Sequence, residues 1–138
     1  ELILSSGPEE THKPRELNDL LGGEAHDVGG KLSWLGMISL MRYVDLVISG
    51  NTGVMHIAAA MGRRQIALHG PTDPALWGPV NPNAVVVRSS CPECPCLRLG
   101  FEYHRFDSSC MSRIDPGDVQ DAVVRLLGEP IRESLAAV

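Results

Sequence analysis

The sequence has no long hydrophobic run and no excess of basic residues, and these absences exclude several classes of protein. Its longest apolar runs, around 57–60 and 85–87, are far shorter than the roughly 20 residues of a membrane-spanning helix. The formal net charge of −5 gives no general electrostatic attraction to nucleic acid or to anionic membranes. The N-terminal stretch lacks the basic region of a signal peptide. We therefore expect a cytoplasmic protein with no nucleic-acid partner.

Cysteine is absent from the first 90 residues, and the four cysteines gather late in the chain, at Cys91, Cys94, Cys96 and Cys110. A secreted disulfide scaffold spreads its cysteines through a loop-rich chain, so this distribution favours a reducing, cytosolic setting. Cys91 and Cys94 have a zinc-knuckle spacing, but Cys94 and Cys96 are awkwardly close for chelating one ion, and a second such pair is absent. The prediction is therefore free thiols or one disulfide and no metal, with zinc at the four cysteines as the alternative.

Strand and helix patterns alternate along the rest of the chain. Valines 85–87 form a continuous run, which is typical of a strand buried on both faces. Ser33 is a candidate N-cap for a helix whose core side would carry Trp34, Met37, Ile38 and Met41. The alternation predicts an α/β fold with a parallel sheet. The expected strands are 1–5, 24–28, 46–49, 65–69 and 84–88; the expected helices are 11–21 (regular only from Pro14), 34–43, 54–61 and 116–127, with an irregular turn at 75–79.

The turn at 50–53, between an apolar strand and an alanine-rich helix, is the strongest candidate site. The first backbone N–H groups of a helix have no internal partners and point beyond the strand end. Gly50 and Gly53 let the backbone approach a ligand closely, and Thr52 adds a hydroxyl donor. The turn therefore predicts a phosphate site. The alternative is a plain turn in which Thr52 caps the helix.

Two further loops leave carboxyl ends of strands, where ligands of parallel sheets bind. The loop 6–10 offers Glu9 and Glu10, which could hold the vicinal hydroxyls of a ribose, or could form a solvated loop before a helix. The loop 70–74 offers Thr72 and Asp73, and Asp73 could instead form a turn with the proline after it. We expect the three loops to converge, and together they would suit a nucleotide-linked ligand.

Several segments together make the sequence recognisable. NTGVMHIAAA at 51–60, HGPTDP at 69–74 and WGP at 77–79 closely resemble the C-terminal half of glycosyltransferase family 9, the ADP-heptose:lipopolysaccharide heptosyltransferases. The resemblance extends back through 30–33 and 6–10 and forward through 110–114, so it covers nearly the whole chain up to Leu127.

The resemblance implies the GT-B fold, in which two Rossmann-like domains face each other across a cleft. Residues 1–128 would be the nucleotide-sugar-binding domain without its first strand, and 129–138 a C-terminal tail. Because the chain lacks an initiator methionine, we expect it to be cut from a longer protein. The N-terminal domain would carry the catalytic base and bind the lipid A–core acceptor. We therefore expect no catalytic residue and no transfer in this chain alone, and peripheral membrane association, at the cytoplasmic face of the inner membrane, only in the intact enzyme.

The family's site can be carried over residue by residue. Thr52 and Gly53 would contact the pyrophosphate of ADP-heptose, and Asn51 would lie close to the sugar. Glu9 or Glu10 would reach the ribose. The remaining donor-binding candidates are Lys31 and Leu32, which would lie against the adenine largely through backbone contacts, and His56, for which a structural histidine bonded to a carbonyl is the alternative. No cofactor is implied.

One position departs from the family, and it keeps other functions open. The family usually has aspartate where this chain has Asn51, and asparagine keeps an acceptor oxygen but loses the charge. A nucleotide-binding or nucleotide-sugar-binding module without transferase activity is therefore one alternative. Another GT-B enzyme, such as a nucleotide-sugar epimerase, is a second, although such enzymes generally need acid/base carboxylates that this sequence does not clearly supply.

Overall fold

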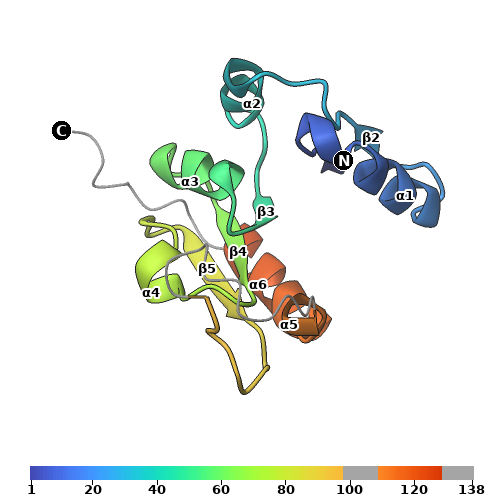
Figure 1. Cartoon of the computed structure of the whole chain (residues 1–138). Helices are drawn as coiled ribbons and strands as arrows, with labels where there is room; N and C mark the ends of the chain where they lie inside the picture. Colours follow the sequence, from blue (N-terminus) through green and yellow to red (C-terminus); the bar gives the residue numbers. More distant parts are fainter. Residues whose placement is uncertain (98–108, 129–138) are drawn as a thin grey trace. The chain divides into compact units, whose positions relative to one another are not determined.

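The structure is a computed structural model, and it describes residues 1–97 and 109–128. The chain forms two compact units, Glu1–Leu40 and Met41–Val138 (Figure 1). The predicted tail at 129–138 and the middle of the cysteine-rich segment lie outside the described residues. The predicted domain boundaries therefore stay predictions.

The first unit is built on a short parallel strand pair. β1 (Ile3–Leu4) pairs with β2 (His26–Asp27), with Ile3 opposite His26. The one-turn 3₁₀ helix η1 (Pro8–Glu10) and α1 (His12–Leu20) connect the two strands. The strands lie within the predicted segments but are shorter. The expectation that the helix becomes regular only from Pro14 is wrong, because proline is tolerated in a first turn whose N–H groups lack helical partners anyway.

The helix α2 (Trp34–Leu40) closes the first unit, and its predicted cap is confirmed. The Gly36 backbone N–H donates to the Ser33 hydroxyl at 3.1 Å. Of the predicted core side, Met37 and Met41 are buried, but Trp34 is 66% exposed and Ile38 is 39% exposed. The core assignment is wrong for these two. They are four residues apart and share one side of the helix, and the described chain leaves that side uncovered.

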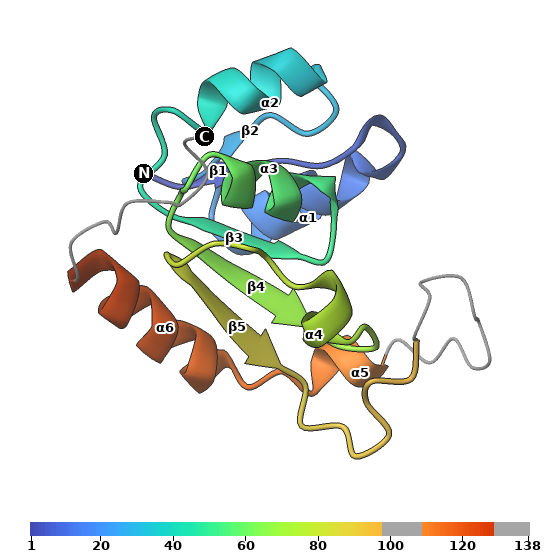
Figure 2. The same ribbon diagram turned by 90° about the vertical axis from the view of Figure 1, so that its left-hand side faces the viewer.

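The second unit contains a three-stranded parallel sheet in the order β3-β4-β5, with β3 at Val47–Gly50, β4 at Gln65–His69 and β5 at Ala84–Arg88. The helix α3 (Gly53–Ala60) connects β3 to β4, and α6 (Pro116–Gly128) packs on the opposite face (Figure 2). Helices on both faces of a parallel sheet confirm the predicted α/β class.

One hydrophobic core of this unit lies between the sheet and α6. Ile66 and Val87 from the sheet pack against Ala122 and Leu126 from the helix. The prediction that β5 is buried on both faces is wrong, since Val86 is 38% exposed. β5 lies at the edge of the sheet, and alternate side chains of a strand point to opposite faces. Only the face of Val87 is covered by α6.

Two short helices complete the second unit: α4 (Pro74–Trp77) and α5 (Ser109–Ser112). The predicted irregular turn at 75–79 is therefore partly wrong. Asp73 Oδ1 accepts the Ala75 backbone N–H at 2.9 Å, and Pro74 occupies the first helical position. The helix ends at Gly78, where a Cβ would stand 2.3 Å from the Pro74 carbonyl oxygen. Asp73 thus has the turn-forming role that was its alternative.

Candidate functional site

The turn between β3 and α3 exposes the N-terminus of the helix. Thr52 holds the N-cap position with an extended backbone (φ −139°, ψ 171°). The backbone N–H groups of Met55 and His56 both donate to the Thr52 carbonyl, at 3.1 and 3.4 Å. The amides of Gly53 and Val54 precede these first helical bonds, at the positive end of the helix dipole. Thr52 and Gly53 are exposed, so an anion can reach these amides.

The side chains around this turn are not committed to the fold. The Thr52 hydroxyl makes no capping bond, so Thr52 occupies the N-cap position of the alternative without the side-chain bond of a cap. Asn51 is half-buried and His56 is exposed. Within the described part of the chain, neither side chain has a hydrogen-bond partner. The predicted carbonyl partner of His56 is therefore absent from these residues, and all three side chains remain available to a ligand.

The loop after β4 lies at the same edge of the sheet. Gly50 of β3 is in register with Leu68 of β4, so the two loops that follow these strands leave the sheet side by side, as predicted. A Cβ on Gly70 would stand 2.6 Å from Met111 Sδ, so this loop packs closely on α5. Thr72 Oγ1 lies 3.1 Å from His69 Nδ1. The polar groups of this loop therefore hold its own conformation.

His69 is the functional candidate that the sequence analysis missed. It is the last residue of β4 and only 1% exposed, and its Nε2 is buried without a hydrogen-bond partner in the described residues. Burial lowers the pKa of His69, and the nearby Arg88 and His56 act in the same direction, against the hydrogen bond to Thr72. The imidazole is therefore neutral near pH 7. The sequence feature that could have identified His69 is its position at the carboxyl end of an apolar strand.

The buried His69 should make the stability of the second unit depend on pH. Since its folded-state pKa lies below the ordinary 6.5, the unfolded chain takes up a proton that the native state resists. The stabilisation is complete above about pH 6.5 and is lost as the pH falls below that value. We expect Tm, measured by calorimetry from about pH 7.5 to 5.5, to fall less steeply in His69→Gln than in the parent. His12→Gln, at an exposed position of the first unit, should leave the slope unchanged; equal slopes for all three proteins would contradict the assignment.

The first unit carries the other predicted group. Glu9 and Glu10 are exposed on η1. Glu10 forms an ion pair with Lys13, and the hydrogen bond from Lys13 holds the pKa of the Glu10 carboxyl below its usual value. Glu9 forms no ion pair with another described residue. Of the two carboxylates, Glu9 is the freer one.

A glycine turn places Lys31 and Leu32 beside this acidic loop. Gly30 adopts φ +66°, and its N–H donates to the Ser6 carbonyl at 3.1 Å. A Cβ there would stand 2.5 Å from the Thr11 side chain, so only glycine suits the position. Lys31 Nζ donates to the Asp27 carbonyl at 2.7 Å. Within the first unit, the fold therefore brings the segment 31–32 next to the loop 6–11.

The predicted donor-binding residues thus fall into two local groups. One contains Glu9, Glu10, Lys31 and Leu32 in the first unit, and the other contains Asn51, Thr52, Gly53 and His56 in the second. Each group is brought together by contacts within its own unit. The roles assigned to these residues stay predictions.

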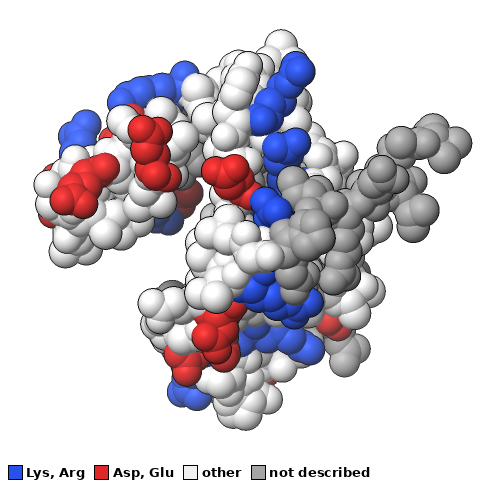
Figure 3. All heavy atoms as spheres, turned by 180° about the vertical axis from the view of Figure 1, so that it is seen from behind, with Lys and Arg blue, Asp and Glu red and all other residues white. Residues whose placement is uncertain are grey.

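The surface has a mixed charge distribution. On the face shown in Figure 3, acidic and basic side chains are interspersed among the described residues. No helix in the described ranges has the length and apolar character needed to cross a membrane.

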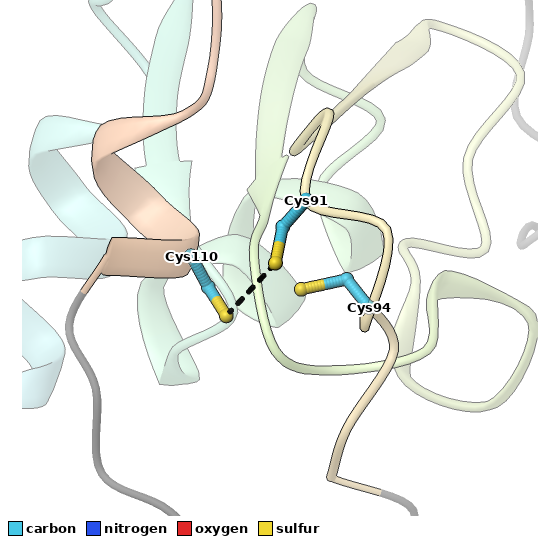
Figure 4. Close-up of side chains that lie close together, drawn as sticks. All are labelled: Cys91, Cys94 and Cys110. Carbon is cyan, nitrogen blue, oxygen red and sulfur yellow. Dashed lines mark hydrogen bonds between the residues drawn. The ribbon is translucent and has the colours of Figure 1, made fainter.

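The four cysteines are free thiols, so the predicted disulfide alternative is not formed. The sulfur atoms of Cys91, Cys94 and Cys110 lie close together, whereas Cys96 is exposed (Figure 4).

Comparisons with known proteins agree on one family. The family model of glycosyltransferase family 9 (heptosyltransferase) matches residues 1–104. The chain is 36% identical over 82 residues to lipooligosaccharide heptosyltransferase 2 of Haemophilus influenzae, and this match covers 57% of this chain and 24% of that protein. It is 34% identical over 79 residues to lipopolysaccharide heptosyltransferase 1 of Escherichia coli K12, and that match covers 56% of this chain and 25% of the relative. The chain thus matches about a quarter of the length of these curated relatives.

Solved structures show the same fold. The glycosyl transferase family 9 protein from Veillonella parvula superposes with a TM-score of 0.74 at 22% identity, covering 93% of this chain and 36% of that one. The E. coli ADP-heptose lps heptosyltransferase II gives a TM-score of 0.68 at 21% identity, covering 91% of this chain and 35% of that one.

Proposed function

The chain belongs to glycosyltransferase family 9, and we propose that it is the donor-binding part of an inverting enzyme that transfers heptose from ADP-heptose to the lipopolysaccharide inner core. The observation that carries the proposal is the open N-terminus of α3. Its amides at Gly53 and Val54 precede the first helical bonds, and the Thr52 hydroxyl beside them makes no cap. In a member of this family, the anion expected at such a helix N-terminus is a nucleoside diphosphate.

The amides would act on the leaving group. When an acceptor hydroxyl attacks the anomeric carbon, the bond from that carbon to the diphosphate oxygen breaks and negative charge grows on the departing ADP. The Gly53 amide is held at the first position of α3, so it can stabilise that charge without reorganisation, and the Thr52 hydroxyl can turn to add a second donor. The positive end of the α3 dipole adds to the same effect.

The nucleoside would be held by the residues of the first unit. Glu9 is the better candidate for the ribose hydroxyls, because the Glu10 carboxylate is already paired with Lys13. The Lys31 ammonium is engaged by the Asp27 carbonyl and its backbone N–H by the Val28 carbonyl, which leaves the Lys31 carbonyl and the backbone of Leu32 for the adenine. Leu32, 37% exposed, offers an apolar surface to the base.

Asn51 favours a second candidate function, a nucleotide-binding module without transferase activity. Asn51 lies within the phosphate turn, directly before Thr52, and its side chain is half-buried. The family usually has aspartate at this position. A neutral amide can orient a sugar hydroxyl by hydrogen bonding, but it cannot accept a proton at neutral pH as a carboxylate can. In the transferase proposal, Asn51 therefore orients the sugar, and the catalytic base lies elsewhere in the intact protein.

The remaining roles belong to the intact protein. The curated relatives extend well beyond the matched region, and a complete cleft would need a second domain that binds the lipid A–core acceptor. We propose that this enzyme works at the cytoplasmic face of the inner membrane. By itself, the chain of 138 residues would bind the donor without transferring its sugar.

Nucleotide selectivity tests the proposal. Titration calorimetry with ADP and UDP should show binding of ADP that is about tenfold tighter or more, because the adenine contact adds to the ribose and phosphate contacts shared by both. ADP-heptose should compete with ADP for the same site. Equal affinity for both nucleotides, or binding of neither, would contradict a donor site for ADP-heptose.

An activity assay separates the two candidate functions. In the intact protein that contains this chain, labelled heptose should pass from ADP-heptose to a lipid A–core acceptor. Selective ADP binding without any transfer would instead support the binding module.

A further inference from the structure

Three cysteine sulfurs from two separate segments lie close together at one end of the sheet (Figure 4). Cys91 and Cys94 lie in the loop after β5, and Cys110 lies in α5. All three Sγ atoms are within 4.8 Å of one another, and those of Cys91 and Cys110 are 3.9 Å apart. Thiolates on one tetrahedral zinc, with Zn–S near 2.3 Å, lie about 3.8 Å from each other. The sulfurs are therefore already spaced as ligands of one ion.

The loop around Cys91 has the hydrogen bonds of a ligand loop. The Cys94 N–H donates to the Cys91 carbonyl at 3.0 Å, which closes the Cys-Pro-Glu-Cys segment into a tight turn. The Cys91 backbone N–H donates to the Ser89 hydroxyl at 3.1 Å, which fixes the start of the loop. These bonds hold the backbone of the loop, and its two sulfurs point toward that of Cys110 (Figure 4).

A disulfide, an iron–sulfur cluster or simple packing would each explain only part of this arrangement of three sulfur atoms. A disulfide needs sulfurs about 2.05 Å apart and joins only two residues, whereas three are gathered here. An iron–sulfur cluster distributes its thiolates over several irons and so holds them farther apart. Packing of cysteine as a small hydrophobe would explain the buried Cys110, but not its convergence with two half-buried thiols.

We propose that Cys91, Cys94 and Cys110 bind one structural zinc ion, with Cys96 as the fourth ligand. Cys96 is exposed and follows Cys94 by two residues on the same loop. The sequence argument against zinc rested on the close spacing of Cys94 and Cys96 and on the absence of a second Cys-x-x-Cys pair. The fold supplies the missing ligand from α5, beyond the segment 98–108. Four thiolates would complete the closed tetrahedral shell that structural zinc prefers.

The zinc ion would hold the loop after β5, which already bonds to the loop after β4, against α5. The backbone N–H groups of Cys96 and Leu97 both donate to the Pro71 carbonyl at 2.9 Å, in the loop after β4. The Ser90 N–H donates to the Arg113 carbonyl at 3.2 Å, so the two ligand segments already meet without metal. Zinc would lock them together. This proposal is independent of the proposed function, since a donor site can exist with or without the ion.

Metal content tests the proposal directly. The chain purified under reducing conditions from zinc-supplemented cells should contain about one zinc ion per chain by mass spectrometry of the metal. Cys91→Ser and Cys110→Ser should each lower that content by about tenfold or more, while Glu93→Ala, between the ligands, should not. Replacement by cobalt should give the thiolate charge-transfer bands and visible spectrum of a tetrahedral site.

A measurement on the parent protein covers the case in which a cysteine variant fails to fold. With zinc bound, the thiols should resist alkylation by iodoacetamide, and a chelator should remove that protection and lower Tm. Cys96→Ser should weaken zinc binding less than Cys110→Ser, because Cys96 is at the exposed side. Absence of stoichiometric zinc together with absence of the cobalt spectrum would overturn the proposal. A disulfide between Cys91 and Cys110 that persists under the reducing conditions of the purification would also overturn it.

Discussion

Replacing Gly53 with proline should weaken ADP binding by about 10- to 100-fold. Proline removes the backbone N–H at the first position of α3, and this amide is the proposed partner of a diphosphate oxygen. A hydrogen bond to a charged group contributes about 1.5–3 kcal/mol, and each 1.4 kcal/mol is about tenfold in Kd. Titration calorimetry with ADP measures the loss.

The turn should tolerate this substitution. Proline is favoured at the first position of a helix, and Thr52 already has the extended backbone required of a residue before proline. Gly53→Ala is the matched control, because it adds a methyl group but keeps the amide, and it should lose less ADP affinity than Gly53→Pro. Thr52→Val and Thr52→Ser separate the hydroxyl in the same way. If Gly53→Pro is folded by circular dichroism and binds ADP with parental affinity, the phosphate assignment is wrong.

The turn at 50–53 could be predicted from the sequence because its determinants are local. An apolar strand, two glycines and an alanine-rich helix follow one another within about 15 residues, and each favours its own conformation wherever it occurs. The cap at Ser33 and the cap at Asp73 are local in the same sense, since each bonds an amide two or three residues away. Local chemistry therefore identified the centre of the candidate site.

Exposure could not be predicted in the same way, because it depends on which elements cover a face. Trp34, Ile38 and Val86 belong to patterns that usually mark a core, yet each is exposed. The apolar pattern of α2 and the valine run of β5 show that these side chains prefer burial. They do not show which neighbours are there to bury them.

Tertiary convergence is the other part that the sequence left open. Cys110 lies far along the chain from Cys91, and only the packing of α5 beside the loop after β5 brings their sulfurs to 3.9 Å. His69 is likewise defined by its surroundings, since its burial and its bond to Thr72 arise from the loop that folds over the strand end. Both features can be read only from the fold.

Replacing Ile66 with alanine should destabilise the second unit by about 2–5 kcal/mol. Ile66 is fully buried at the centre of the cluster formed with Val87, Ala122 and Leu126, and truncation leaves a cavity between the sheet and α6. For a unit of this size, each kcal/mol lowers Tm by about 4–8 °C. Thermal unfolding followed by circular dichroism should therefore show a fall of about 10–30 °C.

Ile48→Ala is the matched control, because the same side chain is 49% exposed on the neighbouring strand β3. It should change stability by about 1 kcal/mol or less, and an equal loss from both variants would contradict the assignment of this core to the part of the sheet that α6 covers, since Ile48 lies beside Ile66 on the same face. The pair also separates stability from binding. At a temperature where Ile66→Ala is still folded, its ADP affinity should match the parent, because the backbone of the turn at 50–53 is fixed by its own hydrogen bonds. Gly53→Pro should show the opposite pattern, with a near-parental Tm and weak binding, since the phosphate contact depends on one amide and the fold on the burial of Ile66.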